Sequence, residues 1–226
     1  MMLLSNNHAH LNPANAGATV ALDARFLTGL ADGADVTSWA GRPGTSKTAS
    51  EAGSGTRPVY KTASGSSRAA PVVRFAGSGR VLSCSSVASS QPYTIFLVSA
   101  IRSVQGRTLS GNPNNWLLGS WTTYSNRFFN GSAWVYQGTD TSTDMIIHVA
   151  RAASNAADYY QSGSANALAV SSTGAPDGLD IGGGWVGSEY SDADVSCVLA
   201  WTSALTDALR RRIEQSLAFS FRIACA

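Results

Sequence analysis

Charged side chains are scarce in this chain. Asp, Glu, Lys and Arg make up 13% of its 226 residues, and the formal net charge is +2. This charged fraction is about half of that in an ordinary globular domain. A nearly neutral chain excludes nucleic-acid binding driven by overall charge. The only basic cluster, Arg210 to Arg212, is expected on the solvated face of a helix.

Glutamate is rarer still, which limits the enzymes that this chain could be. Glycoside hydrolysis needs two carboxyl groups roughly 5–10 Å apart, and the strand-borne glucanase pattern Glu-x-Asp-x-x-Glu is absent. The three glutamates are Glu51, Glu189 and Glu214. Asp192 and Asp194 would share one face of an extended segment, but turn residues at a strand start are the simpler interpretation. We expect no catalysis, and a divergent glycoside hydrolase is the third hypothesis.

Cysteines are few, and long apolar segments are missing. Cys84, Cys197 and Cys225 cannot all pair within one chain, which argues against a disulfide-built secreted module. Cys197 is expected to be a buried free thiol, and a Cys84–Cys225 bridge stays open. No segment approaches a membrane span. The N-terminus resembles no secretory signal, so we expect the protein either to leave the cell by another route, such as lysis, or to stay inside.

Glycine, serine, threonine and alanine take the place of the missing charges, as in turn-rich sheets. Short apolar segments alternate with turn signals at the spacing expected of β-sandwiches. Residues 93–101 and 145–149 are almost unbroken apolar runs, which predicts central strands covered on both faces. Pro58 places the strand at 57–60 on an edge. Residues 45–55 are small and polar, which predicts a loop.

Two more segments complete the coarse pattern. Residues 71–75 and 80–83 flank Gly77 and Gly79, which predicts a hairpin with a short glycine-rich turn. Near the C-terminus, a predicted buried strand over 194–201 leads into a helix. Thr206 is suited to cap this helix, and Asp207 puts a negative charge at the positive end of its dipole.

These segments occur in an order that resembles laminin-G-like domains of the concanavalin A-like lectin/glucanase superfamily. The resemblance rests on residues 22–24, 36–39, 57–58, 71–75, 93–96, 179–183 and 190–195, and on the terminal strand and helix. It implies an all-β fold: a two-sheet antiparallel jelly-roll sandwich with one C-terminal helix. We divide the chain into an N-terminal arm, residues 1–17, and one sandwich, residues 18–226, whose helix covers about residues 207–219.

The resemblance also bears on metals, since some relatives hold a calcium ion at the rim. Hard cations prefer several oxygen ligands, and Asp180, Asp192 and Asp194 would converge if two loops meet. A structural calcium is therefore one alternative, and we expect no other cofactor. His148, in an apolar strand, is expected to be a hydrogen-bonded core residue.

Aromatic residues near loops rich in Asn, Ser and Gly indicate glycan contact. Aromatic faces stack on the apolar side of a pyranose, and amides bind its hydroxyls. The candidate ligand-binding residues are Trp121, Tyr124, Asn126, Trp185 and Tyr190. The alternative is that such rings fill the core or contact other subunits, because aromatic side chains contribute large buried areas.

The preferred hypothesis is a non-catalytic display protein of a larger assembly, on the surface of a bacteriophage virion and of the capsid-decoration or fibre type. It would be a homo-oligomer with other virion subunits as partners, and a cell-surface glycan as a further one. The arm would anchor it through Leu3, Leu4, His8, His10 and Leu11. The runner-up is a free carbohydrate-binding or adhesion module.

Overall fold

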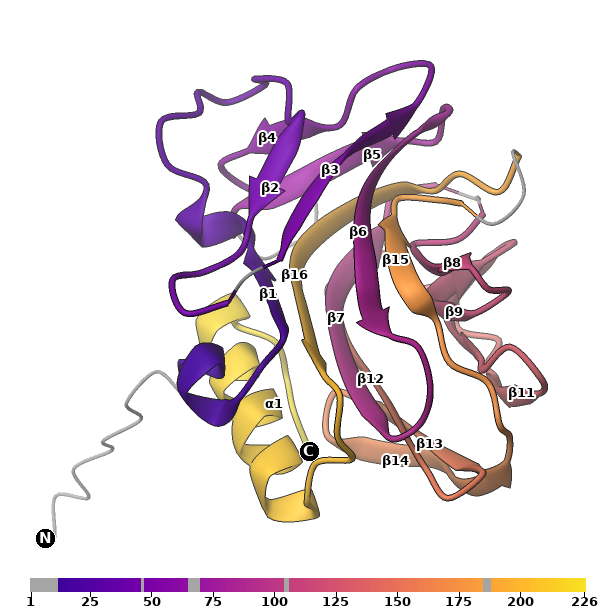
Figure 1. The fold of residues 1–226 in the computed structure, drawn as a ribbon. Helices are drawn as coiled ribbons and strands as arrows, with labels where there is room; N and C mark the ends of the chain where they lie inside the picture. The colour runs from indigo at the N-terminus through magenta and orange to yellow at the C-terminus, as the bar shows by residue number, and fades with distance from the viewer. Residues whose placement is uncertain (1–11, 46, 65–69, 104–105, 185–187) are drawn as a thin grey trace, which may run out of the picture.

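The computed structural model describes residues 12–45, 47–64, 70–103, 106–184 and 188–226. Two antiparallel β-sheets stack face to face, and a C-terminal helix covers the outer side of one of them (Figure 1). The predicted fold class, an all-β two-sheet sandwich with one terminal helix, is confirmed.

We name the sheets A and B. Sheet A has the order β14-β13-β12-β7-β16-β5-β4, with β1 also pairing β16. Its strands are β1 (Val20–Asp23), β4 (Val59–Lys61), β5 (Val72–Ala76), β7 (Tyr93–Ile101), β12 (Ile146–Ala153), β13 (Ala156–Gln161), β14 (Ser164–Ser171) and β16 (Asp192–Trp201). β5 pairs the first part of β16 and β1 the second, on either side of a register shift between Val195 and Cys197.

Sheet B has the order β11-β10-β9-β8-β15-β6-β3-β2. Its strands are β2 (Ser38–Ala40), β3 (Thr48–Gly53), β6 (Arg80–Ala88), β8 (Leu109–Pro113), β9 (Leu117–Trp121), β10 (Tyr124–Phe129), β11 (Trp134–Gln137) and β15 (Asp177–Ile181). The remaining elements are the 3-10 turns η1 (Pro13–Ala16) and η2 (Ala24–Phe26) and the helix α1 (Asp207–Phe221).

Two apolar cores hold these layers together. The first lies between the sheets and contains Trp39, Tyr93 and Trp116, all fully buried. The second lies between the outer face of sheet A and α1, where Ile213 and Leu217 pack. β7, β12 and β16 contribute to both cores, which explains why their sequences lack the alternation of a half-exposed strand. The predicted central strands at 93–101 and 145–149 are thus confirmed.

The C-terminal helix begins as predicted. The Thr206 hydroxyl accepts a hydrogen bond from the Leu209 N–H at 3.3 Å, as an N-cap does. The basic cluster on this helix is only partly exposed, however. Arg211 and Arg212 are exposed, but Arg210 is buried, because its guanidinium lies 3.7 Å from the ring centroid of Tyr160 and pairs with Glu214.

Two local predictions were wrong. Residues 48–53, expected in a loop, form β3, because its neighbours β2 and β6 satisfy its backbone groups while its own side chains are mostly exposed. The expected hairpin at 71–83 is a crossing between sheets, since β5 belongs to sheet A and β6 to sheet B. Gly79 permits the crossing: its φ is +67°, and a Cβ there would lie 2.0 Å from the Ser54 carbonyl oxygen.

Part of the predicted arm packs on the domain. η1 lies beside β16, and the Trp201 indole donates to the Ala16 carbonyl oxygen at 2.8 Å. The predicted anchor residues lie outside the described residues; they are Leu3, Leu4, His8, His10 and Leu11. The boundary of the arm stays a prediction. Among the described residues, no helix combines the length and apolarity needed to cross a bilayer.

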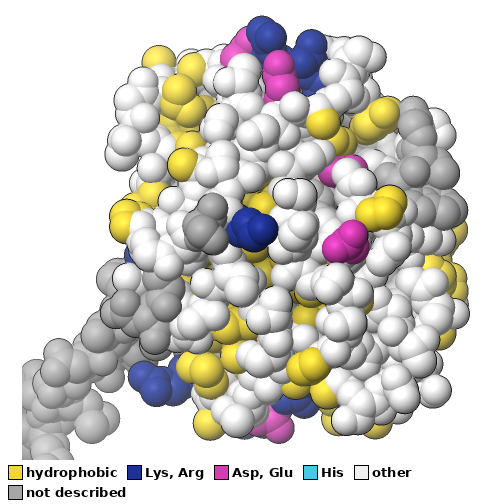
Figure 2. All heavy atoms as spheres, in the orientation of Figure 1, with side chains coloured by type: hydrophobic (Ala, Val, Ile, Leu, Met, Phe, Trp, Pro, Cys, Tyr) yellow, Lys and Arg dark blue, Asp and Glu magenta, His cyan; other side chains and the backbone are white. Residues whose placement is uncertain are grey.

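Most of the face seen in Figure 2 is uncharged, and Lys, Arg, Asp and Glu side chains occur in small separate groups. This surface matches the low charge content of the sequence. The three cysteines are free thiols, so the Cys84–Cys225 bridge is not formed, and Cys197 is buried as predicted.

Candidate functional site

The outer face of sheet B carries a cluster of aromatic rings around one arginine. We call Trp121, Tyr124, Arg127, Phe129 and Trp134 the aromatic platform. They come from β9, β10 and β11, where Tyr124 pairs with Trp121 and Phe129 pairs with Trp134. Side chains alternate along a strand, so Arg127 and Phe129 face outward, on the side opposite the sandwich core.

The intervening residue shows the other half of this alternation. Phe128 points into the sandwich, where its ring centroid lies 5.6 Å from that of Trp116 and 6.3 Å from that of Tyr159. The packing of Phe128 thereby fixes which of its neighbours reach the surface, because a shift of one residue would exchange the two faces.

The rings of the platform contact one another and remain half-buried. The centroids of Trp121 and Trp134 are 5.1 Å apart, and those of Phe129 and Trp134 are 5.2 Å apart. The Cζ of Arg127 lies 4.4 Å from the Tyr124 ring centroid and 5.7 Å from that of Trp134. Aromatic packing and cation–π contact therefore hold the rings in place while part of each stays accessible.

A carboxylate is fixed at one edge of the platform. Glu189 Oε1 accepts a hydrogen bond from the Trp121 indole at 3.1 Å, and Oε2 accepts one from Arg107 Nε. Arg107 also donates to the Trp116 carbonyl oxygen at 3.2 Å. Burial lowers the pKa of Arg107, although the neighbouring Glu189 opposes this shift. Arginine nevertheless stays charged, so the carboxylate is oriented before any ligand arrives.

Arg127 supplies hydrogen-bond donors at the centre of the platform. Its residue exposure is 8%, and Nη1 donates to the Gln137 side-chain oxygen at 3.3 Å. Its buried Nε has no hydrogen-bond partner among the described residues. A buried cation with an unused donor is costly unless another group or a ligand satisfies it.

The structure places the predicted glycan-binding residues in different surroundings. Trp121 and Tyr124 belong to the platform. Tyr190 follows Glu189 in the chain and packs on Gly183, where an added Cβ would come within 2.5 Å of Tyr190 Cδ1. Trp185 lies outside the described residues.

Asn126 faces away from the platform, so its predicted grouping with Trp121 and Tyr124 is wrong. Its Oδ1 accepts a hydrogen bond from the Asp140 N–H at 3.1 Å, and its Nδ2 donates to the Gln161 side chain at 3.3 Å. Asn126 lines an open polar depression of about 610 Å³ between β10 and the β13–β14 turn. Asn126 lies on the same face of β10 as Phe128, whereas a register shift between Tyr124 and Arg127 interrupts the alternation and leaves Tyr124 beside Arg127.

The three aspartates proposed for calcium do not converge. Asp180 lies in sheet B and accepts hydrogen bonds from Ser83 at 2.5 Å and from Asn112 at 3.0 Å. Asp192 and Asp194 lie in sheet A. In the part of the chain that the structure describes, no three His, Cys, Asp or Glu side chains group as metal ligands would. Each carboxylate instead has its own protein donors.

The same contacts bear on the glycosidase hypothesis. Asp194 is fully buried and accepts two hydrogen bonds from Arg74, at 2.7 and 2.9 Å. Asp192 pairs with Arg102 at 2.8 Å and accepts from Ser103 at 2.9 Å. A general acid and base must reach the substrate, and Asp194, which is fully buried, is closed off from the surface by its pairing with Arg74.

The alternative that aromatic rings fill the core holds for Trp116, which is fully buried and whose indole donates to Tyr93 Oη at 2.9 Å. Sequence reasoning missed the polar members of the platform and of its edge. Arg107, Arg127 and Glu189 were not predicted. The one sequence signal for Arg127 was its position two residues before Phe129 in a strand. Arg107 and Glu189 are 82 residues apart, so no local sequence pattern indicated their pairing.

Comparisons with known proteins find similar folds among the solved structures. No protein-family model and no curated protein sequence matches the chain. Domain 4 of AbnA, a GH43 extracellular arabinanase from Geobacillus stearothermophilus, in complex with arabinotriose, superposes with a TM-score of 0.62 at 14% identity. That match covers 88% of this chain and 97% of the other.

Two further similar structures are longer than this chain. Trypanosoma rangeli sialidase in complex with sialic acid matches with a TM-score of 0.53 at 13% identity, over 91% of this chain and 34% of the enzyme. The binding domain of botulinum neurotoxin DC in complex with SialylT matches with a TM-score of 0.57 at 10% identity, over 90% of this chain and 52% of that one. At these identities the likeness shows the fold alone: the chain shares a two-sheet β-sandwich with these structures, and its assignment to laminin-G-like domains stays a prediction.

Proposed function

We propose that this chain is a non-catalytic carbohydrate-binding domain and that the aromatic platform is its binding surface. The observation that carries the proposal is the joint presence of half-buried tryptophan rings and an oriented carboxylate on one outer sheet face. Apolar faces with a few placed polar groups are what ligand recognition requires.

The chemistry of the platform suits a sugar ring. Trp121 and Trp134 offer flat apolar surface to the C–H face of a pyranose. Glu189 uses one lone pair of each oxygen for Trp121 and Arg107, and a carboxylate has about four acceptor positions. The remaining positions accept hydroxyl groups through charge-assisted hydrogen bonds, which are stronger than neutral ones.

The similar structures support this proposal without deciding it. The arabinanase domain and the toxin domain were each solved with a saccharide, and both share the sandwich. Enzymes also occur among the similar structures, but the ion-paired Asp192 and Asp194 argue for binding rather than catalysis. Display on a virion stays a prediction from the sequence, because no described contact concerns an assembly partner.

A glycan array followed by calorimetric titration of the best ligand tests the proposal. Trp121→Ala and Trp134→Ala should each weaken binding by about 2 kcal/mol or more, close to 30-fold. Phe219→Ala is the matched control, because Phe219 is 63% exposed and lies on α1, away from sheet B. The control should bind like the unmodified chain.

The proposal fails if the intact chain binds no saccharide at millimolar concentration. It also fails if both tryptophan variants remain folded, with unchanged melting temperatures, and still bind a saccharide at full strength. In that case the polar depression beside Asn126 would be the alternative surface.

A further inference from the structure

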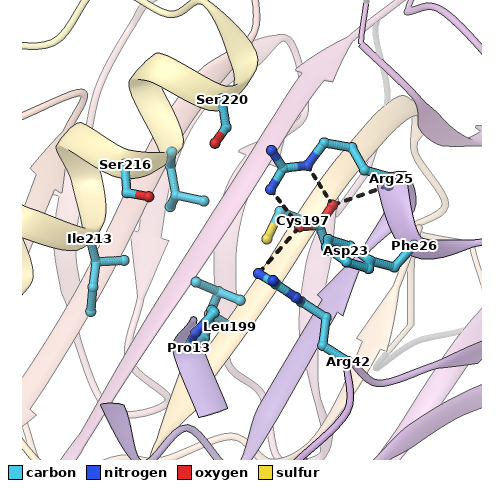
Figure 3. Close-up of a pocket in the computed structure, with 11 residues that line it drawn as sticks. Pro13, Asp23, Arg25, Phe26, Arg42, Cys197, Leu199, Ile213, Ser216 and Ser220 are labelled. Carbon is cyan, nitrogen blue, oxygen red and sulfur yellow. Dashed lines mark hydrogen bonds and ion pairs between the residues drawn. The ribbon is translucent and has the colours of Figure 1, made fainter. Parts of the chain in front are cut away.

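A second site lies on the other side of the molecule, beneath α1. A cavity of about 280 Å³ separates this helix from β1, β16 and η2 (Figure 3). It opens where β16 changes its partner from β5 to β1. Sheet A and the inter-sheet core separate it from the aromatic platform, so the two sites are independent.

Two arginines form one end of this cavity. Arg25 Nε and Nη2 donate to the Asp23 carboxylate at 2.9 and 2.6 Å, and Arg42 Nη1 lies 3.9 Å from the same carboxylate (Figure 3). The Asp23 side chain is 1% exposed and also accepts the Arg25 N–H as the N-cap of η2. One carboxylate thus faces two guanidinium groups, which leaves this end with a positive charge.

Arg42 is the arginine with donors to spare. Its guanidinium packs 4.1 Å from the ring centroid of Phe26 and makes no hydrogen bond to the described residues. Its backbone is fixed, because its N–H donates to the Ala21 carbonyl oxygen at 2.8 Å and its carbonyl oxygen accepts from Thr45. A guanidinium has five N–H donors, so Arg42 can bind a further anion without moving.

The neighbouring thiol does not neutralise these cations. Cys197 lies at the floor of the cavity, and burial, reinforced by the charge of Asp23, raises its thiol pKa well above the ordinary value. The thiol is therefore uncharged at neutral pH. The cationic end of the cavity keeps its charge.

The opposite wall is apolar and comes mainly from the helix. Ile213 and Leu217 line the cavity from α1, and Leu199 lines it from β16. Ser216 and Ser220 add hydroxyl groups along the helix side. A ligand that fills this space needs an apolar body as well as an anionic group.

We propose that this cavity binds a small organic acid, with its carboxylate on Arg42 and Arg25 and its apolar body against Leu199, Ile213 and Leu217. The volume of about 280 Å³ lies just below the range for ligand pockets, roughly 300–1,000 Å³, which limits the ligand to a short chain or a single ring. Bidentate binding of carboxylates by guanidinium groups gives such a site its selectivity.

Titration of the full chain with octanoate tests this proposal. Calorimetry measures the affinity, and amide NMR shifts locate the binding. Octanoate should bind, whereas acetate, which lacks the apolar body, and 1-octanol, which lacks the charge, should bind at least tenfold more weakly. The amide signals of Ser216, Ser220 and Arg42 should shift.

Two variants locate the binding. Arg42→Met keeps an apolar side chain of similar length but removes the charge, and should weaken octanoate binding at least tenfold. Ser216→Phe should block the cavity from its half-exposed rim. Arg211→Met is the matched control, since Arg211 is an exposed residue of the same helix.

Weakened binding in both variants, with normal binding in Arg211→Met, supports the proposal. Equal octanoate affinity in Arg42→Met, equal affinities for octanoate and acetate, or no octanoate binding would each overturn it. None of these outcomes bears on glycan binding, because that experiment uses the opposite face of the sandwich.

Discussion

His148 should make the stability of this protein depend on pH. It lies in β12 with 1% exposure, and its Nδ1 lies 2.8 Å from the Tyr159 hydroxyl. Burial lowers the pKa of His148 from 6.5 to about 3. In the folded protein the imidazole stays neutral at a pH where the same side chain of the unfolded chain takes up a proton.

The sign of the effect follows from this difference. Between the folded pKa of about 3 and the unfolded pKa of 6.5, the unfolded chain binds more protons, so the free energy of unfolding falls as the pH falls. The slope approaches about 1.4 kcal/mol per pH unit. Between pH 7 and pH 5, the free energy of unfolding therefore falls by about 2 kcal/mol.

Urea unfolding at pH 7 and pH 5 measures this loss, and His148→Asn isolates it. Asparagine can keep a polar atom near the Tyr159 hydroxyl but does not titrate. The variant is expected to be less stable at both pH values, yet to lose about 2 kcal/mol less than the unmodified chain between them. All other titrating groups are the same in the two proteins, so their contributions cancel in the comparison. Equal losses in the two proteins would refute the reasoning.

Two other buried features lead to stability predictions. Arg74→Met should lower the free energy of unfolding by about 3–5 kcal/mol, because it removes the Arg74 cation that pairs with the buried Asp194 carboxylate. In urea unfolding, the double variant Arg74→Met with Asp194→Leu should recover most of this stability. A double variant as unstable as Arg74→Met would contradict the role of this ion pair. Gly79→Ala should lower the free energy of unfolding more than Gly29→Ala does. Both glycines have a positive φ, and an alanine in that conformation is destabilising by roughly 1–2 kcal/mol. Only at Gly79 would the added Cβ also clash with backbone, the Ser54 carbonyl oxygen at 2.0 Å. Equal melting temperatures of the two glycine variants would refute that comparison.

The candidate site shows how far local sequence reasoning extends. Trp121 and Tyr124 could be selected because aromatic residues beside turns are often accessible, and both lie on the platform. Asn126 was grouped with them by proximity in the chain, although a register shift between Tyr124 and Arg127 leaves Asn126 on the other face of the strand. The oriented carboxylate depends on Glu189 and Arg107, which the fold brings together from distant segments.

The sequence by itself determined the local elements of this protein. Almost unbroken apolar runs marked β7, β12 and β16 as buried strands, and Thr206 marked the start of α1, because these signals come from neighbouring residues. Only the tertiary structure decided that β5 and β6 lie in different sheets, that Arg210 is buried, and that Arg25 and Arg42 meet around Asp23. Those outcomes depend on which distant backbones pair and which layers stack, and contacts of that range leave no periodic trace in the chain.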